Sequence, residues 1–134
     1  MLDLYAGYNR PPDPKPATKD IQAIFDAIAA TGHLTVADIG GNIIGTYAMY
    51  ICPNLARGGR PFGVIENVIV SAAWRREGAG RALMLHAQDS ARAAGCYKLM
   101  LCTGQGRPGN LRFYEACGFV GDKIGYQVRY VAPT

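Results

Sequence analysis

The residues best suited to chemistry lie between Phe62 and Arg81, where an apolar run is followed by a basic, glycine-containing turn and a helix start. The run Val64–Val70 favours a strand. The first turn of the helix after it leaves backbone N–H groups without partners and carries partial positive charge. Glycines let the backbone approach a ligand oxygen closely. The sequence therefore predicts that a phosphate or pyrophosphate binds at Arg75, Arg76, Glu77, Gly78, Ala79, Gly80 and Arg81.

Two familiar phosphate-binding motifs fit this turn poorly. A P-loop needs a Lys-Ser or Lys-Thr pair after its second glycine, and here Arg81 and Ala82 follow Gly80. A dinucleotide fingerprint needs a small residue where Leu83 stands, and an acidic residue about twenty positions further on, near Cys102, where none is present.

The arrangement Arg-x-x-Gly-x-Gly at Arg75–Gly80 resembles the acetyl-coenzyme A loop of the GNAT superfamily of N-acetyltransferases. A second block, Asn110–Phe119, resembles that superfamily's late helix with its Asn and its Phe-Tyr-Glu. The two blocks come in the right order. Within the superfamily, Ile65–Val68 together with Cys96–Lys98 is similar to the branch of glucosamine-phosphate N-acetyltransferases.

The resemblance implies an acyl-CoA N-acyltransferase fold, an α/β (α+β) protein with a mixed sheet. Residues 1–134 then form a single N-acetyltransferase domain. Periodicity predicts an antiparallel hairpin followed by a strand–helix–strand crossover over Phe62–Cys102.

Such enzymes usually open with a strand before the first helix. This chain begins in what reads as that helix, so either the strand is missing or the natural start lies upstream, and the Leu34–Ile39 edge would be open. The expected elements are helices at Leu2–Tyr8, Asp20–Ala30 (capped by Thr18 or Asp20 and stopped by a left-handed Gly32), Ala82–Ala94 and Asn110–Cys117, and strands at Leu34–Ile39, Ile43–Ile51, Phe62–Val70, Tyr97–Cys102 and Tyr126–Val131.

Acetyl transfer to an amine needs a neutral amine and a stabilised oxyanion. At pH 7 about one alkylammonium in a few thousand is neutral, a penalty of roughly 4–5 kcal/mol. Glu66 is the candidate general base, through a water, because its apolar run would favour a raised proton affinity. It is equally well read as a solvent-facing or structural strand residue. Backbone N–H groups of Val68, Ile69 and Val70 would contact the acetyl oxygen if this strand splays from its parallel neighbour, as the resemblance implies.

Tyr114 is the candidate general acid for the departing thiolate, since a phenol can donate a hydrogen bond without ionising itself. Alternatively it is a packing aromatic. By resemblance, Asn110 binds the pantetheine or a neighbouring phosphate, and it also suits an N-cap. Arg57 and Arg60 lie in a loop that would border the acceptor; they are either solvated or bind an anionic acceptor. His33 and His86 show no triad partner.

Composition narrows the remaining classes. The net charge of +4 and the pI near 9.0 fit a polyanionic cofactor, and the basic residues are too scattered to favour nucleic acid. No apolar stretch suits a membrane span or a signal peptide, which favours a cytoplasmic protein without membrane partners. The four cysteines lack metal-site spacing, so we expect no metal.

We predict an acetyl-CoA-dependent N-acetyltransferase acting on a small-molecule or peptide amine by direct attack, with a homodimer among the allowed assemblies. The alternative is a non-catalytic acyl-CoA sensor of the same fold.

Overall fold

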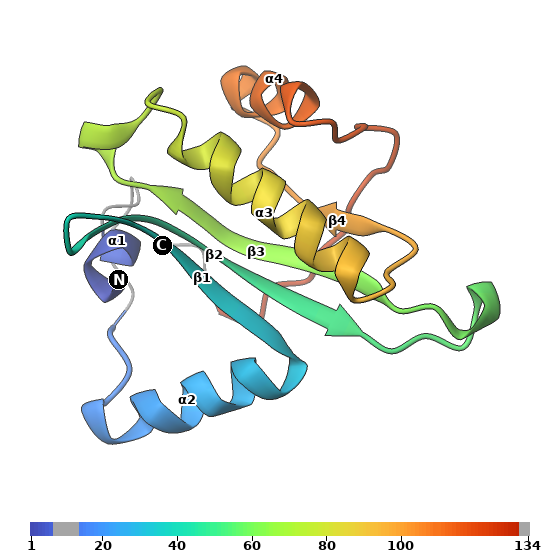
Figure 1. Cartoon of the computed structure of the whole chain (residues 1–134), viewed down its shortest axis with the longest axis horizontal. Coiled ribbons are helices and arrows are strands. Elements are labelled where there is room, and N and C mark those ends of the chain that lie inside the picture. The colour runs from blue at the N-terminus through green and yellow to red at the C-terminus, as the bar shows by residue number, and fades with distance from the viewer. Residues whose placement is uncertain (7–13, 132–134) are drawn as a thin grey trace.

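The computed structural model describes residues 1–6 and 14–131 and contains one mixed sheet with helices on both faces (Figure 1). The elements in chain order are α1 (Leu2–Ala6), α2 (Thr18–Thr31), β1 (Gly32–Ile39), β2 (Asn42–Cys52), the 3₁₀ turn η1 (Arg57–Gly59), β3 (Phe62–Val70), the 3₁₀ turn η2 (Ala72–Trp74), α3 (Ala79–Ala93), β4 (Leu99–Leu101) and α4 (Pro108–Ala116). Strands β1, β2 and β3 are antiparallel neighbours, and β4 is parallel to β3. The predicted hairpin followed by a crossover is confirmed.

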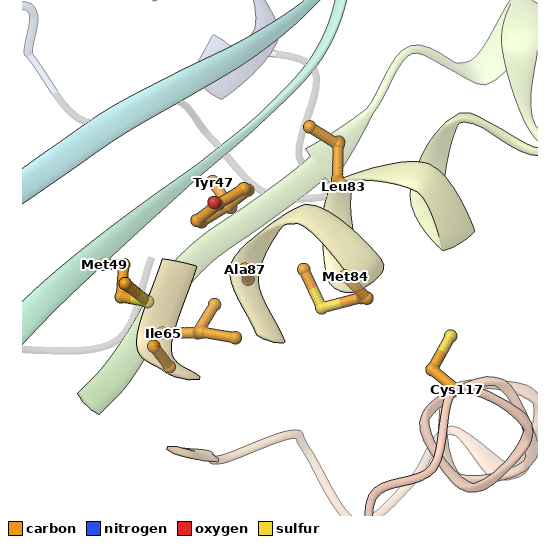
Figure 2. Packing of buried hydrophobic residues seen from close by; sticks show 8 residues of the cluster. Tyr47, Met49, Ile65, Leu83, Met84, Ala87 and Cys117 are labelled. Carbon is orange, nitrogen blue, oxygen red and sulfur yellow. The ribbon is translucent and has the colours of Figure 1, made fainter. Parts of the chain in front are cut away.

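The core lies between α3 and the sheet. In Figure 1, α3 and α4 lie on one side of the sheet and α2 on the other. Helix α3 carries small and apolar residues at four-residue spacing (Leu83, Ala87 and Ala91), so they form one buried stripe. Figure 2 shows this stripe packed against Tyr47 and other apolar side chains. Because the stripe contains two alanines, α3 can lie close to the strands and its start is held at the end of β3.

The opposite face is covered more thinly. Strand β1 forms one edge of the sheet, and no strand precedes α2 within the described residues. Helix α2 has no fully buried residue, and Ile24 of its apolar stripe is 43% exposed. Val36 and Ile39 on β1 stay 40% and 47% exposed. The expected open edge at Leu34–Ile39 is therefore present in the described chain.

The predicted ends of the second helix are wrong in their details. The residue before α2 is Ala17, and neither Thr18 nor Asp20 caps it, because both lie inside the helix. Gly32 is not left-handed: its φ is 175°, and it is already the first residue of β1. A glycine is needed at position 32 for another reason, because a Cβ there would lie 1.8 Å from the Met49 carbonyl oxygen.

The predicted final strand at Tyr126–Val131 is also wrong for this chain. The segment after α4 has no regular secondary structure and pairs with no described strand. The predicted strand at Tyr97–Cys102 shortens to β4, and the predicted first helix is seen only as α1. Residues 7 and 8 of that helix lie outside the described residues.

Candidate active site

The predicted phosphate turn forms the start of α3. Gly78 precedes the helix with a φ of 89°, and Arg76 also has a positive φ of 65°. These two left-handed residues turn the chain sharply between η2 and α3. The first helical hydrogen bond is donated by the Ala82 N–H to the Gly78 carbonyl oxygen, at 3.0 Å. The N–H groups that come before it, and that suit an anion, belong to Ala79, Gly80 and Arg81.

Gly80 has a packing role as well. A Cβ at Gly80 would lie 3.1 Å from Cζ of Phe113 and 3.6 Å from Cγ2 of Val70. The α3 start is thus wedged between the end of β3 and a ring of α4. The Gln88 side-chain amide donates to the Cys117 carbonyl oxygen at 2.8 Å and ties the end of α4 to the middle of α3.

Strand β3 carries a bulge that sequence reasoning missed. Thr46 pairs with Ile69 and Ala48 with Glu66, so Tyr47 of β2 stands opposite two residues of β3, Asn67 and Val68. Asn67 has a left-handed φ of 56°, a conformation that Asn tolerates better than most residues. The bulge changes the direction of the last residues of β3, which lead directly to the phosphate turn.

The pairing of β3 with β4 is short. It covers Gly63–Ile65 against Leu99–Leu101 and ends there. Beyond it the chain leaves the sheet for α4, while β3 continues to Val70. The part of β3 beyond this pairing therefore has the bulge on its β2 side and a diverging chain on its other side. This arrangement agrees with the splay from which a role for Val68, Ile69 and Val70 was predicted.

Glu66 lies just before the bulge and its side chain is exposed. Its neighbour Ile65 is 2% exposed and belongs to the core on the α3 side. Because successive strand residues point to opposite faces, Glu66 belongs to the other face. The expected apolar surroundings are absent because that face is the thinly covered one, so the reasoning from desolvation is wrong.

Tyr114 is partly buried at the α3 side of the sheet. Its ring centroid lies 5.0 Å from that of Phe113 and 6.0 Å from that of Phe119. Asn110 is also partly buried and precedes Tyr114 by four residues, so the two lie on one helix face. Arg107 takes the N-cap position and α4 begins at Pro108, so the N-cap interpretation of Asn110 is wrong.

A hydrogen-bonded chain of three side chains links β1, β2 and α3. The Tyr47 hydroxyl oxygen lies 3.0 Å from Nε2 of His33 and 2.7 Å from Nδ1 of His86. Burial raises the pKa of Tyr47. Burial first, and then the nearby His86, lower the pKa of His33. Sequence reasoning missed this connection, because the strand register that joins the two histidines to Tyr47 cannot be read from local spacing.

Other predicted residues lie further away. Arg57 and Arg60 are exposed at the end of the β2–β3 hairpin, far from the α3 start (Figure 1), and the Arg57 guanidinium lies 5.6 Å from the Tyr97 ring centroid. A shallow hollow of about 310 Å³ borders the phosphate turn and is lined by Ala37, Ile39, Ile44, Trp74, Glu77, Gly78 and Ala79. Among residues 1–6 and 14–131 we find no cluster of three or more potential metal ligands, and no helix long and apolar enough to cross a membrane.

Comparison with known proteins places this geometry in a family. The model of the acetyltransferase (GNAT) family matches residues 1–119, which include the bulged strand, the phosphate turn and α4. The chain belongs to the GNAT family. A solved structure from Agrobacterium tumefaciens str. C58, provisionally assigned as an acetyltransferase, superposes with a TM-score of 0.85 at 44% identity, over 96% of this chain and 90% of that one. The fold is thus that of GNAT acetyltransferases, as predicted.

Two curated relatives have a named substrate. Glucosamine 6-phosphate N-acetyltransferase of Trypanosoma brucei brucei is 39% identical over 79 residues, which are 59% of this chain and 52% of that protein. Glucosamine 6-phosphate N-acetyltransferase 1 of Oryza sativa subsp. japonica is 33% identical over 119 residues, which are 84% of this chain and 70% of that protein. The match thus spans only about half the length of the trypanosomal relative.

Proposed function

We propose that this GNAT protein is an acetyl-CoA-dependent N-acetyltransferase that transfers the acetyl group directly to an amine. The observation that carries the proposal is the succession of three features along one strand and its helix. Along the chain, the end of the β3–β4 pairing at Ile65 comes first, the bulge at Asn67 and Val68 follows, and the N–H groups at the α3 start come last. In this proposal the bulged part of β3 meets the thioester and the α3 start meets the pyrophosphate. Family membership supports the same assignment.

The cofactor phosphates are proposed to bind at the turn from Arg75 to Arg81. Backbone N–H groups of the α3 start would hold the pyrophosphate, and the arginines would add charge-assisted hydrogen bonds. Arg75 now reaches back to the Val70 carbonyl oxygen at 3.4 Å, a long contact that an oxyanion would readily replace. The acetyl oxygen would then lie at the backbone of Val68–Val70, and Asn110 would contact the pantetheine arm.

The two candidate catalytic side chains come from opposite faces of the sheet. Glu66 belongs to the face away from α3, and Tyr114 packs on the α3 side. An amine that approaches from the Glu66 face could lose its proton through a water, while the thiolate leaves toward the Tyr114 hydroxyl. Attack and departure on opposite sides of one carbonyl suit direct transfer without an acetylated enzyme residue.

Glucosamine 6-phosphate is the acceptor that we propose to test first. The support is the printed activity of the two curated relatives, together with the similarity at Ile65–Val68 and Cys96–Lys98. The net charge of +4 also favours an anionic acceptor over a cationic one.

The test is release of free thiol from acetyl-CoA across a panel of amines. The panel contains glucosamine 6-phosphate, glucosamine, a polyamine and a lysine peptide, with acetyl-CoA alone as the blank. We expect amine-dependent thiol release that is largest for the phosphorylated sugar. Tight acetyl-CoA binding in calorimetry with no thiol release for any amine would instead favour the non-catalytic acyl-CoA sensor.

We also propose a homodimer in which a second copy covers the segment after α4. Apolar side chains alternate along it, and four of them, Ile124, Tyr126, Val128 and Tyr130, are 76–95% exposed. Alternation of this kind suits a strand whose apolar face is buried, and the described residues of one chain do not bury it. A cytoplasmic location stays part of the proposal and is tested by cell fractionation.

A further inference from the structure

The hydrogen-bonded side chains His33, Tyr47 and His86 join β2, at the position opposite the β3 bulge, to β1 and to the middle of α3. Tyr47 is fully buried and stands opposite the bulge residues Asn67 and Val68, which would meet the acetyl group. His86 lies two turns along α3, the helix whose start would hold the phosphates. We propose that Tyr47 and His86 are positioning residues. Their hydrogen bond fixes the position of α3 relative to the β3 bulge and so aligns the sites for the phosphate and acetyl ends of the cofactor. This inference rests on the proposed function.

The geometry explains why a hydroxyl is needed at this position. Tyr47 is also part of the apolar core, so a Phe would fill the same volume. Its hydroxyl, however, bonds α3 at 2.7 Å and β1 at 3.0 Å. A hydrogen bond fixes direction and distance, whereas apolar contacts along the alanine stripe allow sliding. The phenol therefore sets the register of α3 on the sheet.

The protonation states of the two imidazoles decide whether both hydrogen bonds to the Tyr47 hydroxyl can form. With both imidazoles neutral, one ring N–H donates to the Tyr47 oxygen, and the Tyr47 O–H donates to the other ring nitrogen. With one imidazole protonated, the same pattern holds. With both protonated, both rings are donors, and the phenol proton loses its acceptor nitrogen.

The surroundings of the two rings differ, because His86 is exposed and His33 is partly buried. The ring centroids of His33 and His86 are 6.1 Å apart, so two positive rings would repel. The groups that face the phenol are these two rings and the hydroxyls of Thr35 and Ser90. On α3, Asp89 lies three residues after His86 and is paired with Arg92 at 2.8 Å, and Arg81 lies five residues before His86. Acidification should therefore loosen α3 and weaken binding of acetyl-CoA.

The test uses variants that keep hydrogen bonds but cannot titrate. An Asn amide places a donor or acceptor where Nδ1 of His86 lies, and a Gln amide does so for Nε2 of His33. We expect acetyl-CoA affinity of the wild type, measured by calorimetry, to fall about 5–30-fold more between pH 7.5 and 5.5 than that of the His33→Gln/His86→Asn double variant, since a lost contact of 1–2 kcal/mol has this size. The ligand titrates identically in both, so the difference isolates the histidines. Equal pH dependence of the two proteins would overturn the proposal.

A second measurement does not need the cofactor. Tyr47→Phe should speed amide hydrogen exchange in residues 82–89 of α3 about fivefold or more, the size expected for loss of a hydrogen bond. Tyr50→Phe, on the opposite face of the same strand, is the matched control and should leave this exchange unchanged. Unchanged exchange in Tyr47→Phe would refute a hold on α3 whether or not acetyl-CoA binds. Failure of the wild type to bind acetyl-CoA at pH 7.5 would instead reject the proposed function, and with it the alignment of a cofactor.

Discussion

Gly80 at the start of α3 lies against Phe113 of α4, so closely that an added Cβ would be 3.1 Å from Cζ of the ring. This contact couples two blocks of sequence that are separated by the whole of α3 and β4. Gly80 therefore belongs to the proposed phosphate site and also leaves the space that Phe113 of α4 occupies. Substitutions here act on packing and on ligand binding together.

Gly80→Val is expected to lower the free energy of unfolding by about 1–3 kcal/mol, because its branched side chain meets both Phe113 and Val70. Chemical denaturation measures this loss. Adding Phe113→Leu should restore part of the stability, while any clash with a bound phosphate would remain. A Gly80→Val protein as stable as the wild type would mean that α4 is not held this closely.

Removal of a single arginine side chain tests phosphate binding at the turn with less effect on packing. Arg75→Ala and Arg81→Ala remove exposed side chains, so folding should survive. Each should weaken acetyl-CoA binding about 5–30-fold at low salt and less at high salt, as expected for hydrogen bonds from a charged group. Calorimetry at two salt concentrations measures both effects. Arg92→Ala, at the other end of α3, is the control, and an equal loss there would point to net charge alone.

The parts that sequence predicted well are those with local causes. The apolar run set the bounds of β3 correctly, because it ends at a polar turn. The turn predicted a helix close to the observed one, but α3 begins at Ala79, three residues before the expected Ala82, directly after Gly78 with its left-handed φ. Gly95, also left-handed at a φ of 76°, ends this helix as expected.

The features that sequence could not predict depend on register. The bulge at Asn67 adds one residue to β3 opposite Tyr47, and an apolar run reads the same with or without it. The contact of Tyr47 with His86 joins residues 39 positions apart. The alternation at Tyr126–Val131 is real, but a strand needs a partner strand, and the described chain offers it none.

Glu66→Gln should lower turnover about 10-fold, less than the roughly 10²–10⁴-fold typical of a general base, since an exposed base would act through water. Acetyl-CoA affinity should stay unchanged because Glu66 lies on the face away from α3. The acidic limb of the pH–rate profile should disappear. Steady-state kinetics from pH 5.5 to 9 checks this, with Glu115→Gln on α4 as the control. A retained acidic limb would assign deprotonation to another group or to bulk water.

Val128→Asp should convert the proposed dimer into a monomer, because a carboxylate would be buried without a partner at the covered segment. Light scattering after size exclusion should then give a mass near 14.4 kDa in place of about twice that value. Gln127→Asp adds the same charge at the neighbouring position, which points to the other side of an extended segment, and should leave the dimer intact. A wild type that is already monomeric at high concentration would contradict the proposed assembly.

Tyr114→Phe removes one hydroxyl from a ring that packs between Phe113 and Phe119. The ring contacts should survive, so stability and acetyl-CoA affinity should stay near the wild-type values. Turnover should fall about 10²–10⁴-fold if the hydroxyl protonates the leaving thiolate, because general acids contribute rates of this size. Single-turnover kinetics establishes whether the chemical step limits the rate. If chemistry limits the rate and Tyr114→Phe stays within about threefold of the wild type, Tyr114 is a packing residue, and the proton must reach the thiolate from water.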